Sequence, residues 1–319
     1  MRISSAKTLK VIKMIEEYEL LDPQVHKNIA IVPIKTPINH NIDILTLKKG
    51  FELELATVKE CEQSTVNTII VENQSIVPLL LVDGEEIVGG DQNRIMDATV
   101  LIGPQSASKI PVNCTEHGRW SYKSEFKQSE HIANYSTRLA KHRAFRNKGS
   151  VQQAVWDSID ELEMSRSFSS PTQAMSESYE NAKADMNEFL DAFDIVQGQT
   201  GIVVMIDGEV KGFEIFLNSE IYREYHEKII KSYLINADVN DNVFTVNIDS
   251  IKSIIDDALS DESEEVKNIG LESRFELKSK DGIGSIYTYK DELIHMSYLG
   301  ESADLSAENE NPIVDDVII

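Results

Sequence analysis

The sequence predicts an α+β fold in which an N-terminal antiparallel β-sandwich or barrel packs with helices and a smaller C-terminal β-meander. Three observations support this prediction. Short apolar or alternating runs fill residues 29–115, helical patterns begin after residue 128, and further alternating runs follow residue 200. A succession of strands and then helices is typical of α+β proteins, and turn residues at intervals of about ten in the first region favour antiparallel strands.

The N-terminal part begins with apolar side chains at helical spacing over residues 5–20, which end before Asp22-Pro23 and predict a short helix. Next come the runs NIAIVPI, FELELATV, TIIVEN, VPLLLV, TVLIGP and KIPVNC, which are separated by proline, glycine and asparagine. We expect each run to be a strand. In FELELATV the glutamates alternate with apolar residues, as in a sheet with one solvated face.

Two segments in the second half carry helix-start signals. Ser150 precedes Gln153 by three residues in GSVQQAVWDSIDEL, and Ser170 precedes Gln173 in a segment that also carries Pro171. Both match the capping box, in which a hydroxyl accepts a hydrogen bond from the third helical residue. Proline is favoured at the first helical position, so we expect helices to start directly after Ser150 and Ser170.

The last third combines hairpins and helices. GIVVMIDGEVKGFEIF alternates on both sides of Asp207-Gly208, which is the strongest short hairpin signal in the chain. Apolar stripes predict helices over 220–235 and 249–260. The runs RFELKSK, GSIYTYKD and ELIHMSYL predict the closing meander.

These elements define one main domain. We expect a single α+β domain over residues 28–299, with a β-rich part at 28–127 and a helical part with hairpins at 128–299. A helical segment at 1–27 precedes it, and an acidic tail at 300–319 follows it.

Composition restricts the partners and the compartment. The formal net charge of −23 argues against nonspecific binding to nucleic acid or to anionic membranes. Only Cys61 and Cys114 are cysteines, too few for a disulfide framework. The N-terminus lacks the apolar core of a signal peptide, and no run reaches the ~18 apolar residues of a membrane helix. We therefore expect a cytoplasmic protein, and leave homo-oligomerisation open.

The best candidate for chemistry is DGEEIVGGDQNRIMD, residues 83–97. Glu85 and Glu86 follow a buried-type strand, and Gly89-Gly90 let the chain turn so that the side chains of the QNR triplet return beside them. Such a set suits a general acid/base pair, a hard-metal site with Asp91, or a grip on sugar and phosphate. The alternative is a surface hairpin with weak ion pairs.

The second candidate is NCTEHGRWSY, residues 113–122. It combines a thiol, a carboxylate, an imidazole and a guanidinium within six residues, at Cys114, Glu116, His117 and Arg119. Trp120 beside Arg119 suits a nucleotide base or ribose. In the alternative, Cys114 ends a buried strand and Trp120 packs on the core.

Residues 121–148 form a basic segment in this acidic chain, with seven Lys or Arg against Glu125 and Glu130. It suits a phosphorylated ligand, but pairing with the acidic bulk is the favoured interpretation. The histidines within and beyond it show no metal-ligand spacing.

Together the two candidates resemble the signature of the ARG and Rhodanese-Phosphatase-superfamily-associated Protein domain, a prokaryotic and phage family. The residues that carry the resemblance are DGEEIVGGDQNR and IPVNCTEHGRW, and similar segments follow in order over roughly residues 28–299. The association of this family with ADP-ribosylglycohydrolases and rhodanese-like phosphatases is by gene neighbourhood, and the resemblance implies no established activity. One departure is Asp91, where a lysine is more usual, and an acid there disfavours a phosphate contact.

Two functions follow as expectations. The first is binding or hydrolysis of an NAD-derived or ADP-ribose-like nucleotide metabolite, in a prokaryotic or phage conflict or nucleotide-signalling system. Its catalytic residues would be Glu85, Glu86 and Glu116; its ligand-binding residues would be Gln92, Asn93, Arg94, Arg119 and Trp120; no metal ligand is assigned and the cofactor is unknown. The second is a noncatalytic interaction or assembly protein, in which the two motifs form a structural polar network.

Overall fold

The computed structural model describes residues 17–37, 42–61, 67–260, 263–279 and 281–301. Its largest layer is a nine-stranded antiparallel sheet with the order β1-β3-β13-β14-β18-β17-β16-β15, and β2 also pairs with β3. The strands are β1 (Glu19–Leu20), β2 (Gln24–His26), β3 (Ile29–Lys35), β13 (Gly201–Ile206), β14 (Glu209–Phe216), β15 (Ser263–Val266), β16 (Ser273–Lys278), β17 (Gly282–Tyr289) and β18 (Glu292–Gly300). Strands from both ends of the chain therefore share one sheet.

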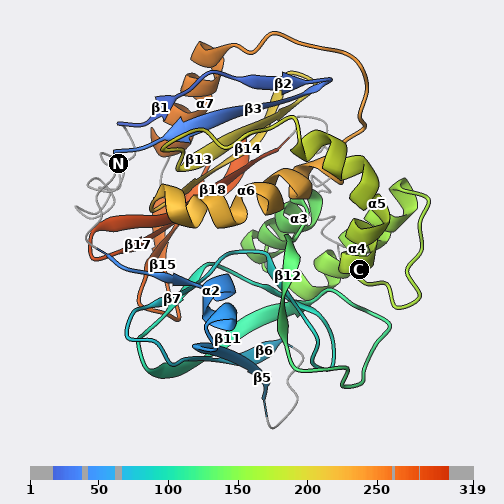
Figure 1. Ribbon diagram of the computed structural model, residues 1–319, viewed down its shortest axis with the longest axis vertical. Coiled ribbons are helices and arrows are strands. Elements are labelled where there is room, and N and C mark those ends of the chain that lie inside the picture. The colour runs from blue at the N-terminus through green and yellow to red at the C-terminus, as the bar shows by residue number, and fades with distance from the viewer. Residues whose placement is uncertain (1–16, 38–41, 62–66, 261–262, 280, 302–319) are drawn as a thin grey trace, which may run out of the picture.

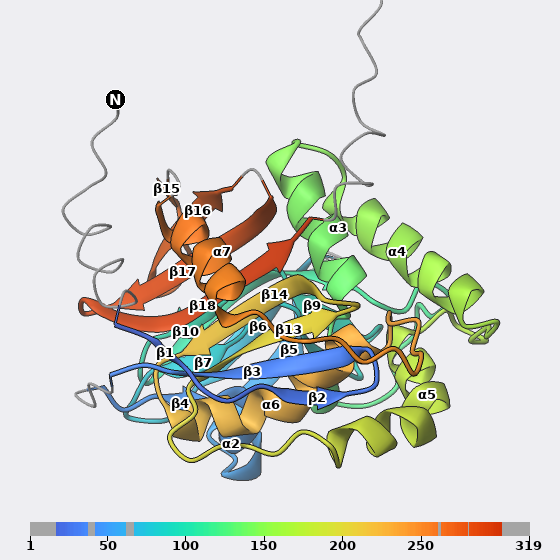
Figure 2. The same cartoon turned by 90° about the horizontal axis from the view of Figure 1, so that it is seen from above.

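Both faces of this sheet are buried, which explains why its central strands are almost continuously apolar. Ile31 and Val204 contribute to a core shared with helices α3 (Tyr135–Arg146), α4 (Val151–Ser165), α5 (Met175–Leu190) and α6 (Ser219–Leu234). Their neighbours Val32 and Val203 contribute to a core shared with α7 (Ile248–Ser260). Successive side chains of a strand point to opposite faces, so α6 and α7 lie on opposite sides of β3 and β13 (Figure 2).

Two smaller sheets form the other β layer, below α6 in Figure 1. A six-stranded sheet has the order β12-β8-β9-β11-β6-β5, and a three-stranded sheet has the order β10-β7-β4. Their elements are β4 (Leu45–Thr46), α2 (Leu47–Glu52), β5 (Ala56–Glu60), β6 (Thr68–Asn73), β7 (Leu79–Leu81), β8 (Glu85–Val88), β9 (Arg94–Met96), β10 (Val100–Ile102), β11 (Ser106–Cys114) and β12 (Lys127–Ile132). Leu81, Ile87 and Val112 belong to the core between them.

The predicted α+β class is confirmed, and several predicted elements match closely. The hairpin β13–β14 turns at Asp207 and Gly208, whose φ angles are 54° and 83°. Such positive φ values are those of the hairpin turn that an Asp-Gly pair predicts. Ser150 caps α4 by accepting a hydrogen bond from the Gln153 amide, as expected. The closing meander β16–β17–β18 is present, and it continues the large sheet.

Other local predictions are wrong for identifiable reasons. FELELATV does not form one strand: its first two residues end α2, which the Thr46 hydroxyl caps, and β5 begins at Ala56. The helix expected after Ser170 starts at Met175, because the intervening residues pair with the chain around Glu116.

The ends of the chain differ from the expected domain limits. Residues 19–20, the end of the predicted N-terminal helix, form β1, whereas residues 1–16 lie outside the described residues. The expected acidic tail also lies outside them from residue 302 onward. No helix in the described ranges has both the length and the apolarity to cross a membrane.

Candidate functional site

The two sequence motifs lie side by side in the six-stranded sheet. In β8 and β9, Ile87 is opposite Arg94, and in β9 and β11, Arg94 is opposite Cys114. The hairpin that carries GEE and QNR is therefore hydrogen-bonded to the strand that leads into CTEHGRW.

The turn between β8 and β9 requires its two glycines. Gly89 and Gly90 have φ angles of 121° and 51°, which side-chain-bearing residues rarely adopt. A Cβ on Gly89 would lie 2.5 Å from the Glu125 carbonyl oxygen, and one on Gly90 would overlap the Phe126 ring. The Gly90 amide donates to the Ser124 carbonyl at 2.9 Å, so this turn packs directly on segment 117–125, which we call the GRW loop.

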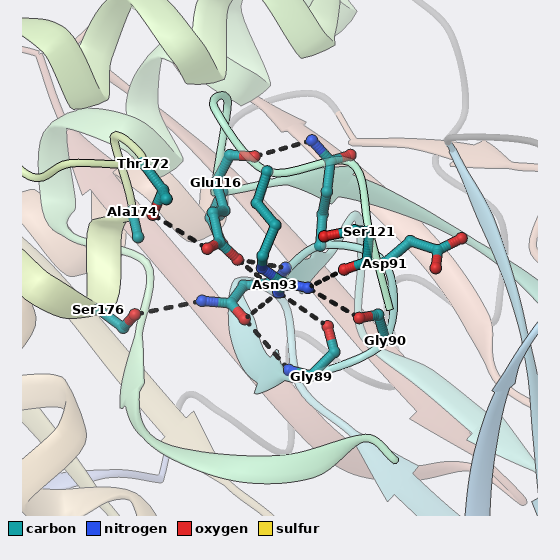
Figure 3. Close-up of polar contacts among 12 residues, drawn as sticks. Gly89, Gly90, Asp91, Asn93, Glu116, Ser121, Thr172, Ala174 and Ser176 are labelled. Carbon is teal, nitrogen blue, oxygen red and sulfur yellow. Dashed lines mark hydrogen bonds and ion pairs between the residues drawn. The ribbon is translucent and has the colours of Figure 1, made fainter. Parts of the chain in front are cut away.

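Arg119 joins the turn to the GRW loop. Its Nη1 donates to the carbonyls of Gly90 and Ser121, both at 2.8 Å. Its Nη2 donates to the Gly89 carbonyl, to Asn93 Oδ1 and, at 2.5 Å, to Glu116 Oε2. Figure 3 shows the acceptor residues Gly89, Gly90, Asn93, Glu116 and Ser121 grouped around these bonds. Both terminal nitrogens of Arg119, a predicted ligand-binding residue, thus donate hydrogen bonds to groups of the protein itself.

Glu116 is the acidic centre of this network. Besides Arg119, the Thr172 hydroxyl donates to its Oε1 at 3.0 Å, and the Asn93 amide donates to its Oε2 at 3.2 Å. Burial opposes ionisation, but the bonds and charge of Arg119 outweigh it and lower the pKa of Glu116 below its ordinary value. The Glu116 carbonyl also accepts from Gln92 Nε2 at 2.8 Å. Glu116 is therefore held as a paired carboxylate.

Glu85 and Glu86 are both fully buried, although an extended strand would turn one of them outward. Glu85 faces α6, where its Oε2 accepts from the Tyr225 hydroxyl at 3.1 Å and its Oε1 lies 3.7 Å from Lys228 Nζ. It also accepts from Gln128 Nε2 at 3.1 Å. The first three residues of β8 are buried and the fourth is half-buried, so the strand has no solvated face.

The hydrogen-bond donors to Glu86 are two neutral hydroxyls, whereas Glu116 accepts from a guanidinium and Glu85 lies beside Lys228. The Thr115 hydroxyl donates to Oε1 at 2.9 Å, and the Ser129 hydroxyl donates to Oε2 at 2.8 Å. Burial raises the pKa of Glu86 to about 7, only partly offset by these two hydroxyls. This carboxyl exchanges its proton near neutral pH.

The structure corrects the expected partner of Arg94. The guanidinium is buried and lies 3.6 Å from Glu60, instead of beside Glu85 or Glu86. Its Nη1 contacts Gln92 Oε1 at 3.4 Å.

Cys114 and Trp120 have opposite environments. Burial raises the pKa of Cys114 to about 11, so the thiol is protonated at neutral pH and lacks the reactivity of a nucleophile. Trp120, by contrast, is 60% exposed on the GRW loop and does not pack on the core.

A second buried polar cluster was missed by the sequence analysis. Asp83, the residue before the GEE motif, is fully buried and contacts three bases on α3. Lys141 Nζ donates to Oδ1, His142 Nε2 lies 2.8 Å from Oδ2, and Arg138 Nε lies 3.8 Å from Oδ2. Burial opposes ionisation of Asp83, but these bases hold its pKa well below its ordinary value. The i, i+3, i+4 spacing of the three bases was a usable signal.

The cluster extends into the large sheet. Arg138 Nη1 donates at 2.5 Å to Glu214 on β14, whose Oε2 lies 3.2 Å from His295 Nε2 on β18. His295 Nδ1 lies 2.8 Å from the Thr99 hydroxyl, which accepts from the Asp83 amide at 3.0 Å. Part of the basic segment therefore pairs with buried acids, the favoured interpretation of its sequence.

The described residues thus contain two largely buried polar networks near the motifs, one around Glu116 and Arg119 and one around Asp83 and Arg138. Trp120 is 60% exposed, His117 of the second candidate is also exposed, and Arg119 keeps 11% of its side chain exposed. No three His, Cys, Asp or Glu side chains in the described part of the chain converge as a metal-binding group.

Comparison with known proteins identifies one family. The model of the ARPP-1 family, described as ARG and Rhodanese-Phosphatase-superfamily-associated Protein domain, matches residues 17–299. Searches of curated proteins and of solved structures found no match.

Proposed function

The chain belongs to the ARPP-1 domain family, and from that premise we propose that it is a noncatalytic interaction protein. In this proposal the two motifs are a structural polar network that holds the GRW loop in one conformation. The observation that carries it is the bonding of Arg119. A guanidinium that donates to three backbone carbonyls, an amide oxygen and a carboxylate has its terminal nitrogens committed to the fold.

The GRW loop itself supports an interaction role. Trp120 and Tyr122 are 60% and 66% exposed and belong to the same loop. The loop is braced at its base, since the Lys123 amide donates to the Gly90 carbonyl at 3.0 Å and Gly118 donates to the Thr172 carbonyl at 2.8 Å. Exposed aromatic side chains on a rigid support are typical centres of protein interfaces. We therefore assign the partner surface to this loop.

The first test separates a structural arginine from a ligand-binding one. We expect Arg119→Ala to lower the free energy of unfolding by about 3 kcal/mol, because Glu116 is left buried without its counter-charge. The matched control is Lys123→Ala on the same loop, whose side chain is exposed and which we expect to change stability by less than about 0.5 kcal/mol. Urea denaturation measures both. Equal stability of the two variants would contradict the structural role.

The second test addresses the interaction surface. A photo-crosslinking amino acid at position 122 is expected to give a discrete protein adduct in cells, and Arg119→Lys is expected to reduce it by releasing the loop. The control position is Met164, which is 71% exposed on α4. Adducts of the same pattern from both positions would argue against a specific surface on the loop.

A second candidate function is binding or hydrolysis of an NAD-derived or ADP-ribose-like nucleotide metabolite. The observation that favours it is Glu86, because a carboxyl with a pKa of about 7 is suited to general acid–base catalysis. Trp120 offers a face for stacking an adenine ring. Because Glu86 is fully buried, this candidate requires a conformational change that exposes it to the ligand.

Two experiments test this candidate. Fluorescence of Trp120 in a Trp156→Phe background, titrated with ADP-ribose and NAD, tests binding. Chromatography of the nucleotides after incubation tests turnover, which Glu86→Gln must abolish.

A further inference from the structure

A pocket of about 330 Å³ lies away from both motifs. Its walls come from α5, from the C-terminal ends of α4 and α6, and from the turn between β2 and β3. In Figure 1 the ribbons of α4 and α5 lie together at one side of the molecule. The volume is at the small end of the range for pockets that bind small organic ligands.

The pocket has apolar lining residues. Met186 and Phe189 are three residues apart and so share one face of α5, and Leu234 comes from the last turn of α6. All three belong to the core of the helical layer, which fixes their positions. A ligand body that contacts them must be apolar.

Arg166 follows α4 and provides the first cation. Its Nη1 donates to the Ile235 carbonyl at 3.3 Å, which orients the guanidinium. Its Nη2 has an ion pair of 3.6 Å with Asp185, and its buried Nε has no hydrogen-bond partner among the described residues. Nε and Nη2 together form the edge of a guanidinium that binds a carboxylate through two parallel hydrogen bonds. This edge is thus underused.

Lys27 provides the second cation. Its Nζ lies 3.1 Å from Glu188 Oε1 and 5.2 Å from the centre of the Phe189 ring. The acids that pair with the two cations are exposed, with 81% of the Asp185 side chain and 60% of the Glu188 side chain accessible. Exposed ion pairs contribute little free energy, so a ligand anion can displace these carboxylates.

We propose that this pocket binds a small organic carboxylate with an apolar body. The carboxylate replaces Asp185 at the Nε–Nη2 edge of Arg166, and the apolar body contacts Met186, Phe189 and Leu234. Lys27 adds a second positive charge at the rim. This site shares no residue with either motif, so it stands independently of the proposed function.

The probe is 2-naphthoate, with 2-naphthamide as its neutral counterpart. Ligands of this size with ordinary efficiency bind with a Kd of about 1 mM, which isothermal titration and ligand-observed NMR can measure. We expect the carboxylate to bind at this affinity or tighter, and the amide to bind at least about tenfold more weakly, since it cannot accept both charged hydrogen bonds. Absence of naphthoate binding, or equal affinity for the two probes, overturns the proposal.

Two variants of the pocket are expected to change the affinity for 2-naphthoate in opposite directions. Arg166→Gln is expected to weaken naphthoate binding by about tenfold. Asp185→Asn is expected to strengthen it by a few-fold, because it removes the competing carboxylate. Lys183→Gln on the same helix removes an exposed charge outside the pocket and is expected to leave the Kd unchanged.

The bond from Arg166 to the Ile235 carbonyl also supports the fold, so thermal melting must accompany the binding data. If Arg166→Gln unfolds, Lys27→Gln is the second loss variant, with an expected weakening of several-fold. Weaker binding in Asp185→Asn than in the wild-type protein would contradict the assigned carboxylate position, whichever loss variant is used.

Discussion

Glu86 makes stability depend on pH at the level of one residue. Its pKa rises from 4.5 to about 7 in the folded protein, so the folded state binds more protons than the unfolded state between these values. The contribution of Glu86 to stability therefore falls as pH rises from about 5 to 7. We expect Glu86→Gln to be more stable than the wild-type protein by about 1–3 kcal/mol at pH 8 and by little at pH 4.5. Urea denaturation across this range measures the difference.

The difference in unfolding free energy between Glu86→Gln and the wild-type protein excludes the titration of His131, which has the opposite effect on stability. Burial lowers the pKa of His131 to about 4, so its contribution to stability increases from pH 4 to about 6.5. His131 is present in both proteins and its contribution cancels in the comparison.

Glu85→Gln is the contrasting variant. It leaves a single acceptor oxygen for Tyr225 and Lys228 and removes the charge that faces Lys228, so we expect it to destabilise the protein. A pH-independent difference for Glu86→Gln would contradict the assignment.

For single residues, the sequence pattern identified the polar residues of the two motifs but not the side chains that they pair with. The GEE and GRW motifs were recognisable as polar clusters, and the glycine turn between Glu86 and Asn93 followed from the glycine pair. The partner of Arg119 is Glu116, three residues away, whereas Arg94 pairs with Glu60, from a strand that the motif does not include. Partner choice depends on which strands become neighbours, which local pattern does not encode.

Helix α4 stabilises the edge of a strand through one side chain. Gln152 Oε1 accepts from the Cys114 amide at 2.8 Å, and its Nε2 donates to the Cys114 carbonyl at 2.9 Å. The side-chain amide thus replaces a neighbouring strand at the end of β11. We expect Gln152→Ala to lower the free energy of unfolding by about 2 kcal/mol, because two buried backbone groups lose their partners.

The adjacent glutamine is the matched control. Gln153 Nε2 bonds Asp157 on the exposed side of α4, so Gln153→Ala should change stability by less than about 0.5 kcal/mol. Denaturation and hydrogen exchange of the Cys114 amide measure both. Slow exchange of that amide in Gln152→Ala would refute the bridging role.

Element prediction succeeded where one local signal decided the structure. Ser150 caps α4 and Asp207-Gly208 forms the hairpin turn, and each needs only nearby residues. Ser170 failed as a helix cap because its hydroxyl accepts from the amides of Thr172 and Ala174 in a turn, while Ala174 bridges to Glu116. A tertiary contact delayed that helix, and no local preference could reveal it.

Across the whole molecule, the Asp83 cluster connects the two β layers. Asp83 lies in the turn between β7 and β8 of the smaller sheets, Arg138 belongs to α3 and Glu214 belongs to the large sheet. The sequence pattern places the run NIAIVPI with the other N-terminal strands, but this run forms β3 and pairs with β13, so the large sheet is assembled from both ends of the chain. The spacing of Arg138, Lys141 and His142 could indicate a basic helix face, but the acids that pair with it follow from the topology.

Arg138 is the central charge of this boundary, since it is fully buried and contacts both Asp83 and Glu214. Arg138→Met leaves these carboxylates undercompensated in the interior, and we expect a loss of about 3–5 kcal/mol in unfolding free energy. Adding Glu214→Gln removes one orphaned charge, so the double variant should lose less than the sum of the single variants by at least about 1 kcal/mol. Exposed Arg223→Met on α6 is the control for removal of an arginine, with an expected change under about 0.5 kcal/mol. Additive single and double losses would show that Arg138 and Glu214 stabilise the layers independently, contrary to the coupling that their 2.5 Å contact implies.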